Sequence, residues 1–159
     1  MTVDNLSRVV RGIASLAAQR VLVGIPSTEA PRTNDEINNP MNNATIGYIM
    51  ENGSPVNNVP ARPFLVPGVR DARLAIVRRL ADASRAALDG SDRRVDQNLN
   101  AAGLTAQASV RNKITDGPFL PLAPRTLAQR RARGRTGERP LIDTGQLRNS
   151  INYVIRRGA

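Results

Sequence analysis

The side chains of this sequence that are suited to acid–base or nucleophilic chemistry lack the partners that such chemistry needs. The chain contains neither His nor Cys, which removes the usual general base, the usual metal ligand and any thiol or disulfide. The carboxylates between residues 71 and 96 stand among arginines at helical spacing, and surface ion pairs explain them. The hydroxyls of Thr144 and Ser150 have no activating base, and no spacing links them to the single lysine, Lys113.

The phosphate-binding motifs G-x-x-x-x-G-K-[S/T] and G-x-G-x-x-G are also absent, and no cluster has metal-ligand spacing. We therefore expect no enzymatic activity, no cofactor and no metal, and a protein that acts through its surfaces.

Basic residues are concentrated near the carboxyl end. The formal net charge is +10, and residues 117–159 hold nine basic and two acidic side chains, a net +7. All basic residues except Lys113 are arginines. Arginine suits phosphate and carboxylate recognition, although a GC-rich genome also produces this bias.

Within this region the segment RTLAQRRARGRTGER (125–139) has six arginines and one glutamate. Three interpretations stay open: it follows a phosphate backbone, it becomes ordered against an acidic protein, or it is a solvated loop without a partner. The absence of interleaved aromatic residues argues against single-strand recognition. The candidate contact residues here are Thr126, Arg130, Arg131, Arg133 and Arg135.

The apolar pattern predicts the elements that must position these residues. Repeats of three and four predict helices over 3–18, 69–88 and 92–115. A β-rich run at 20–25 and another at 152–156 predict two strands. With 159 residues the chain is expected to form one domain, 1–159. The fold class is α+β: about three sizeable helices packed on a small, mostly antiparallel sheet.

Three segments between these elements are predicted to be irregular. Residues 26–43 are rich in Pro, Asn and acidic residues and predict a mobile loop. A short helix over 44–53 follows and ends at Asn52-Gly53. Repeated prolines predict an extended arm over 54–68, and the Pro- and Arg-rich stretch 118–139 predicts an extended basic arm with up to two helical turns after its prolines.

The last segment, 140–159, is expected to be a C-terminal anchor. Asp143 and Gln146 have the spacing of a capping box at the start of a short helix. Leu141, Leu147 and Ile151 are expected to be buried.

No membrane segment is predicted. No apolar run approaches the ~18 residues that a spanning helix needs, and the amino terminus lacks the pattern of a secretory signal. We expect a protein of a reducing compartment, with the apolar face of helix 3–18 buried in the domain or in a subunit interface rather than on a lipid surface.

Four segments in a fixed order resemble a known family: YIMENGS (48–54), VPARPFLVPG (59–68), PLAPRTLAQRR (121–131) and PLIDTGQLRNSI (140–151). The succession is similar to that of the neck and tail-completion proteins of long-tailed bacteriophages, often labelled virion morphogenesis or tail-component proteins. It spans about two thirds of the chain. Asn52 departs from the pattern, because an aromatic residue is commoner there. The matching residues are Glu51, Gly53, Ser54, Val59, Pro60, Arg62, Pro63, Phe64, Leu65, Leu122, Thr126, Leu127, Arg130, Leu141, Asp143, Thr144, Gly145, Leu147 and Ser150.

The resemblance implies a structural virion protein, made in the host bacterial cytoplasm and built into the neck of the particle. It implies a homo-oligomeric ring, a hexamer or a dodecamer, around the DNA channel. Its neighbours would be the connector or head-closure protein and the tail terminator or tail tube. The two arms and the anchor would then supply the interfaces, and the basic arm would face either channel DNA or an acidic connector surface.

Two other functions are kept as alternatives. One is a non-specific nucleic-acid-binding protein that uses the C-terminal arginine cluster, whose affinity would fall steeply with salt. The other is a tail terminator ring, which co-purification with tail tube rather than with portal would identify.

Overall fold

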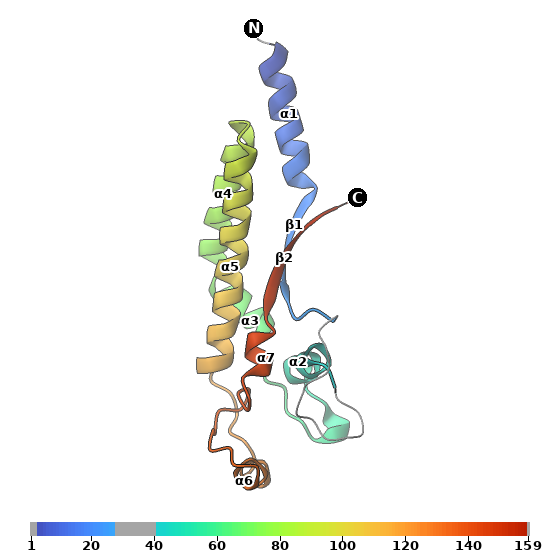
Figure 1. Ribbon diagram of the computed structural model, residues 1–159, viewed down its shortest axis with the longest axis vertical. Coiled ribbons are helices and arrows are strands. Elements are labelled where there is room, and N and C mark those ends of the chain that lie inside the picture. Colours follow the sequence, from blue (N-terminus) through green and yellow to red (C-terminus); the bar gives the residue numbers. More distant parts are fainter. Residues whose placement is uncertain (1–2, 28–40, 159) are drawn as a thin grey trace. The chain divides into compact units, whose positions relative to one another are not determined.

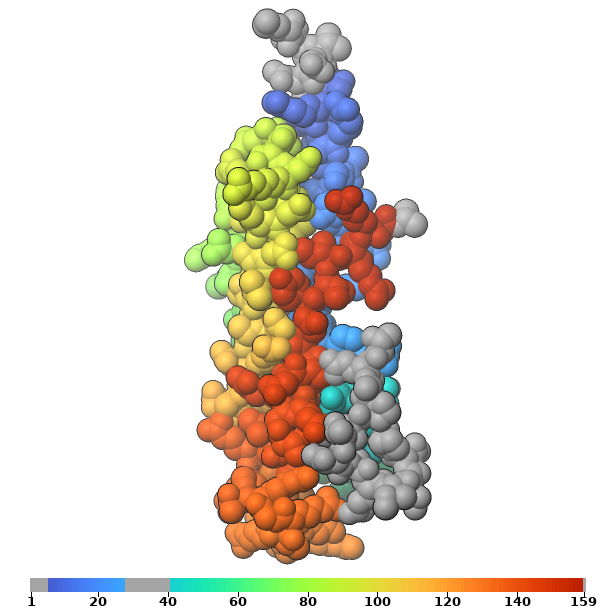
Figure 2. Space-filling view, in the orientation of Figure 1, coloured from blue at the N-terminus to red at the C-terminus, as the bar shows by residue number. Residues whose placement is uncertain are grey.

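The computed structural model describes residues 3–27 and 41–158 and has the α+β architecture that the sequence predicts (Figure 1). Seven α-helices and a two-stranded antiparallel sheet form this part of the chain. Most of the predicted mobile loop, residues 28–40, lies outside the described residues and is grey in Figure 2. In chain order the elements are α1 (Val3–Ala17), β1 (Gln19–Gly24), α2 (Asn43–Asn52), the 3-10 turn η1 (Pro55–Asn57), α3 (Leu65–Asp71), α4 (Arg73–Leu88), α5 (Asp92–Asp116), α6 (Pro124–Ala132), α7 (Gln146–Asn149) and β2 (Asn152–Arg157).

The chain falls into two compact units. Unit 1 comprises Met1–Val23, Val69–Ala108 and Tyr153–Ala159, and unit 2 comprises Gly24–Gly68 and Ser109–Asn152. The predicted anchor, 140–159, is therefore divided between the two units. That the whole chain folds as one domain stays a prediction.

In unit 1 the core lies where α4 and α5 run side by side (Figure 1). Ala83, Ala86 and Ala87 on α4 are buried and pack with Val95 and Leu99 of α5. The buried residues of α4 at this contact are thus small alanines, which permit close packing against the larger side chains of α5. Partly buried side chains from α1, β1 and β2 cover this cluster: Leu16, Val21 and Ile155.

Part of the apolar surface of unit 1 stays exposed. α1 packs against α4, yet Leu6 is 68% exposed and Val10 is 56% exposed. On α4, Leu74 and Val77 are exposed as well. The apolar face of helix 3–18 is therefore only partly covered within unit 1, and burial of its exposed residues in a subunit interface stays a prediction.

The core of unit 2 gathers residues from segments far apart in the sequence. The buried side chains include the three that the anchor pattern predicts, Leu141, Leu147 and Ile151. They are joined by Phe64, Val110 and Ile114.

The predicted extended arm, 54–68, is wrong in part. Its first residues form a closed turn, in which η1 lies between the bridged residues Ser54 and Val59. Its last residues begin α3, with Pro67 inside the first turn. Proline is tolerated there because the first-turn N–H groups have no partner within the helix. The predicted helix 69–88 is accordingly two helices, α3 and α4, which are separated at Ala72.

Gly68 lies where α3 and α5 of unit 2 touch, and its replacement should be costly. A Cβ at Gly68 would stand 2.8 Å from Cα of Val110, a main-chain atom that cannot rotate away. Ser109 Oγ also donates to the Gly68 carbonyl at 2.7 Å, which fixes this approach. We expect Gly68→Ala to lower the free energy of unfolding by about 1–3 kcal/mol in urea denaturation. The control Gly24→Ala, whose Cβ would meet no atom within 4 Å, should change it by less than about 0.5 kcal/mol; equal losses in both variants would contradict the prediction.

Candidate functional site: an arginine-centred framework in unit 2

The predicted basic arm contains a helix that includes three of its six arginines. Residues 124–132 form α6, with Pro124 in its first turn. Arg130, in the last turn of α6, is 9% exposed. Arg130 can be buried because its guanidinium has hydrogen-bond acceptors within the chain. The helical turns predicted within the stretch 118–139 are therefore present as α6, which begins earlier than expected, at Pro124.

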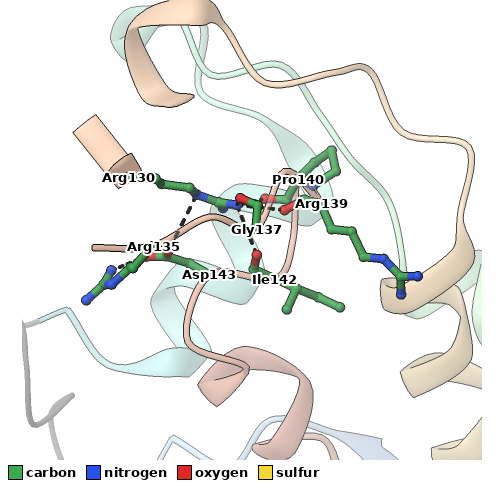
Figure 3. Close-up of polar contacts among 7 residues, drawn as sticks. All are labelled: Arg130, Arg135, Gly137, Arg139, Pro140, Ile142 and Asp143. Atoms are coloured by element: carbon green, nitrogen blue, oxygen red, sulfur yellow. Dashed lines mark hydrogen bonds and ion pairs between the residues drawn. The ribbon is translucent and has the colours of Figure 1, made fainter. Parts of the chain in front are cut away.

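The guanidinium of Arg130 bonds the loop that follows α6 (Figure 3). Its Nη1 donates to the carbonyl oxygens of Gly137 at 2.9 Å, Arg139 at 2.9 Å and Ile142 at 3.0 Å. Its Nη2 donates to the carbonyl of Pro140 at 3.4 Å. Because Nη1 carries two hydrogens and has three acceptors, one of these bonds is shared. One side chain thus satisfies four main-chain oxygens of a segment that has no regular structure.

Asp143 supplies the counter-charge for this cluster. Arg130 Nε lies 3.4 Å from Asp143 Oδ1, and Arg135 Nη1 bonds to Asp143 Oδ2. The predicted capping box is therefore wrong: α7 begins after Gly145, which occupies the N-cap position without a side-chain bond. Gly145 has φ of 79°, a conformation that favours glycine. The carboxylate of Asp143 is bonded to the two guanidiniums instead of to the start of α7.

Arg62, in the second matching segment, bonds the other proline-rich stretch in the same way. It is buried, and it donates from Nε to the carbonyl of Leu120 at 3.3 Å and from Nη2 to that of Pro121 at 3.5 Å. Burial, and then the positive charge of Arg130, lower the pKa of Arg62.

Glu51, on α2, is the last member of the framework, whose other members are Arg62, Arg130 and Asp143. Its carboxylate accepts from the main-chain N–H groups of Phe64 at 2.7 Å, Leu65 at 2.8 Å and Val66 at 3.0 Å. Pro67 has no N–H, and the N–H of Gly68 bonds to the Phe64 carbonyl. Every N–H of the first turn of α3 therefore has a partner, although no side chain next to the helix start supplies one.

The other predicted residues differ in their burial. Ser150 is buried, and its hydroxyl donates to the Leu147 carbonyl at 2.8 Å. Arg131 lies at the surface and pairs with Glu138 at 3.3 Å. A pocket of about 140 Å³ brings several of the predicted residues together; its lining is Ile46, Met50, Arg130, Pro140, Leu141, Asp143, Gly145 and Leu147. Thr126 and Leu65 are half-buried, and Pro60, Pro63, Arg133 and Thr144 are exposed.

In this framework the side chains of Arg62, Arg130 and Glu51 link main-chain segments that lie apart in the sequence. The N–H groups of Arg130 and Arg62 named above meet main-chain oxygens or Asp143, and Glu51 meets main-chain N–H groups. In the described part of the chain no group of three or more acidic residues is placed to hold a metal ion, and no helix is long and apolar enough to cross a membrane.

The sequence places Glu51 and Arg62 in the segments that resemble the phage neck proteins. It does not predict the hydrogen bonds that these two side chains make. One signal was present for Glu51: the residues before α3, Arg62-Pro63-Phe64, include no usual N-cap residue, so that helix needs a distant acceptor. For Arg62 no local signal exists, because its acceptors are carbonyls 58 and 59 residues away.

No family model matches this chain, and no curated protein or solved structure matches it either.

Proposed function

We propose that this chain is a structural subunit of the neck of a long-tailed phage particle, where a ring of copies joins the DNA-filled head to the tail. The proposal starts from the four sequence segments that resemble the neck and tail-completion proteins. It is supported by one observation: side-chain bonds connect these four segments in series within unit 2.

The connections follow the order of the segments. Glu51 of the first accepts from Phe64 and Leu65 of the second. Arg62 of the second donates to Pro121 at the start of the third. Arg130 of the third bonds to Pro140, Ile142 and Asp143 of the fourth. If the four segments match the neck proteins for a structural reason, their side chains are expected to contact one another. A chance match in sequence gives no reason for such contacts.

Exposed apolar side chains on unit 1 are consistent with self-association. Leu6, Val10 and Ile13 recur at helical spacing on α1, and Leu74 and Val77 do so on α4. Exposed apolar patches on a protein surface mark interaction sites when they are large and contiguous. In a ring, head-to-tail contacts between copies would cover such rows.

The nucleic-acid-binding alternative loses two of its four candidate arginines. Arg130 is buried and bonded to main-chain oxygens, and Arg135 is paired with Asp143. A DNA phosphate would have to displace these partners. The tail-terminator alternative differs only in its neighbour, and co-purification with tail tube rather than with portal would support it.

Native mass spectrometry at moderate salt tests the proposal. We expect a discrete ring of six or twelve copies. The variant Val10→Asp should reduce the ring to smaller species because it places a charge in an exposed apolar row. The control Arg93→Asp, at an exposed position of α5, should leave the ring intact. A chain that stays monomeric over the full range of concentration and binds DNA with a steep salt dependence would overturn the proposal in favour of the nucleic-acid alternative.

A further inference from the structure

The two-stranded sheet of unit 1 has a defined register. Gly158 N–H donates to the Ala18 carbonyl just before β1. Continued along an antiparallel ladder, this pair places Arg20 opposite Arg156 and Leu22 opposite Val154. All four of these side chains are exposed. One face of the sheet is therefore open and carries two arginines and two apolar residues.

The same register leaves the outer edge of β1 without a strand. In an antiparallel ladder the N–H and C=O groups alternate in direction, so those of Gln19, Val21 and Val23 point away from β2. Within the part of the chain that the structure describes, the sheet contains β1 and β2 alone. Neither a proline nor a charged side chain occupies these three positions, although such residues commonly protect free edges.

An apolar groove lies beside this edge. It has a volume of about 310 Å³, and the side chains of Gln19, Val21 and Val23 form one wall. Helices α4 and α5 supply most of the remainder through Ile76, Leu80, Ser84, Leu99, Ala102 and Ala106. A strand added to β1 would direct every second side chain into this groove, because side chains alternate between the two faces of a sheet.

The two arginines on the open face favour an acidic partner. Arg20 and Arg156 are like charges directly opposite each other, an arrangement that disfavours the isolated sheet. An acidic side chain on the outer face of an added strand would lie next to Arg20 and relieve the repulsion.

We infer that the free edge of β1 binds an extended segment of a partner protein as a third strand, with apolar side chains in the groove and acidic ones beside Arg20 and Arg156. A second copy of this chain fits less well. The chain is strongly basic overall, and its described non-helical stretches at 117–123 and 135–143 contain prolines, which cannot supply a regular ladder. The inference does not depend on the proposed neck function, because it concerns an edge and a groove of unit 1.

Three synthetic peptides test it: an acidic alternating one, Thr-Val-Glu-Val-Asp-Val-Thr; a scrambled one, Thr-Val-Val-Glu-Asp-Val-Thr; and one with lysines in place of the two acids. Fluorescence anisotropy with the full chain should show at least tenfold tighter binding of the acidic alternating peptide. Hydrogen exchange at the amides of Val21 and Val23 should slow at least tenfold on binding, because those amides become ladder donors.

The double variant Arg20→Glu, Arg156→Glu keeps a like-charge pair across the strands, so the sheet should be no less stable than before. It should bind the acidic peptide roughly tenfold more weakly and the lysine peptide more tightly. Arg93→Glu, the same charge change on α5, should leave both affinities unchanged. The inference would be overturned if the amides of Val21 and Val23 were already protected from exchange in the free chain. It would also be overturned if the peptide affinities were the same in the double variant as in the unmodified chain. A failure here leaves the ring experiment unaffected, and the reverse also holds.

Discussion

The Arg130→Ala variant is expected to lose about 3–5 kcal/mol of folding free energy, a larger loss than we expect from either Glu51→Ala or Gly68→Ala. Removing the guanidinium leaves the carbonyls of Gly137, Pro140 and Ile142 without their donor. It also leaves Asp143 with Arg135 as its remaining guanidinium partner. Because Arg130 is 9% exposed, water does not readily replace these bonds. We therefore expect the loop 133–143 to lose its fixed conformation.

Urea denaturation followed by circular dichroism measures this loss, and two matched variants interpret it. Arg131→Ala removes the neighbouring arginine, whose pair with Glu138 is 68% exposed on both sides, and should cost less than about 0.5 kcal/mol. Arg130→Lys keeps the charge, but an ammonium group has three donors and no planar fork, so most of the loss should persist. If Arg130→Ala were as mild as Arg131→Ala, the framework would not stabilise unit 2.

Local pattern accounts for the part of this fold that is built from long periodic segments. The three-and-four spacing of apolar residues locates α1 and α5 to within one or two residues, and the β-rich runs locate β1 and β2. The predicted helix 92–115 ends within one residue of the end of α5 at Asp116, before Gly117 and Pro118. Such signals lie within a few residues of the structure that they specify, so a single sequence is sufficient to read them.

Proline is the least reliable local signal in this chain. Pro67 and Pro124 belong to stretches whose prolines predict extended chain, yet each lies in the first turn of a helix. In that position a missing N–H costs nothing, so proline begins a helix as readily as it prevents one. For α3, the choice between helix and extended chain depends on an acceptor for the remaining N–H groups, and Glu51 lies 13 to 15 residues away.

The framework itself is beyond local pattern for the same reason. Asp143 and Gln146 have capping-box spacing, but Asp143 bonds to Arg130 and Arg135, which precede it by 13 and 8 residues. Periodicity also predicts that α1 has an apolar face without saying what covers it, and the outer half of that face is exposed. The resemblance singles out four segments, and the bonds among them are visible only in three dimensions.

Replacement of Glu51 by alanine is the second test of this framework, with an expected loss of about 2–4 kcal/mol. The carboxylate accepts from three consecutive N–H groups at the start of α3, and no other side chain bonds to them among the described residues. Without it, Phe64 is the residue most directly affected, because its N–H loses a 2.7 Å bond while its ring is 1% exposed in the core. α3 should begin later, and Phe64 should loosen.

Three variants separate this capping role from a general effect of charge. Glu51→Gln keeps one acceptor oxygen without the charge and should retain about half of the stability that Glu51→Ala loses. Glu138→Ala removes an exposed carboxylate and should change the free energy of unfolding by less than about 0.5 kcal/mol. Combined with Arg130→Ala, Glu51→Ala should cost less than the sum of the two single losses, because both act on one connected framework. Strict additivity would mean that the first and fourth segments are stabilised independently, and the series of bonds that supports the proposed function would then be two separate local features.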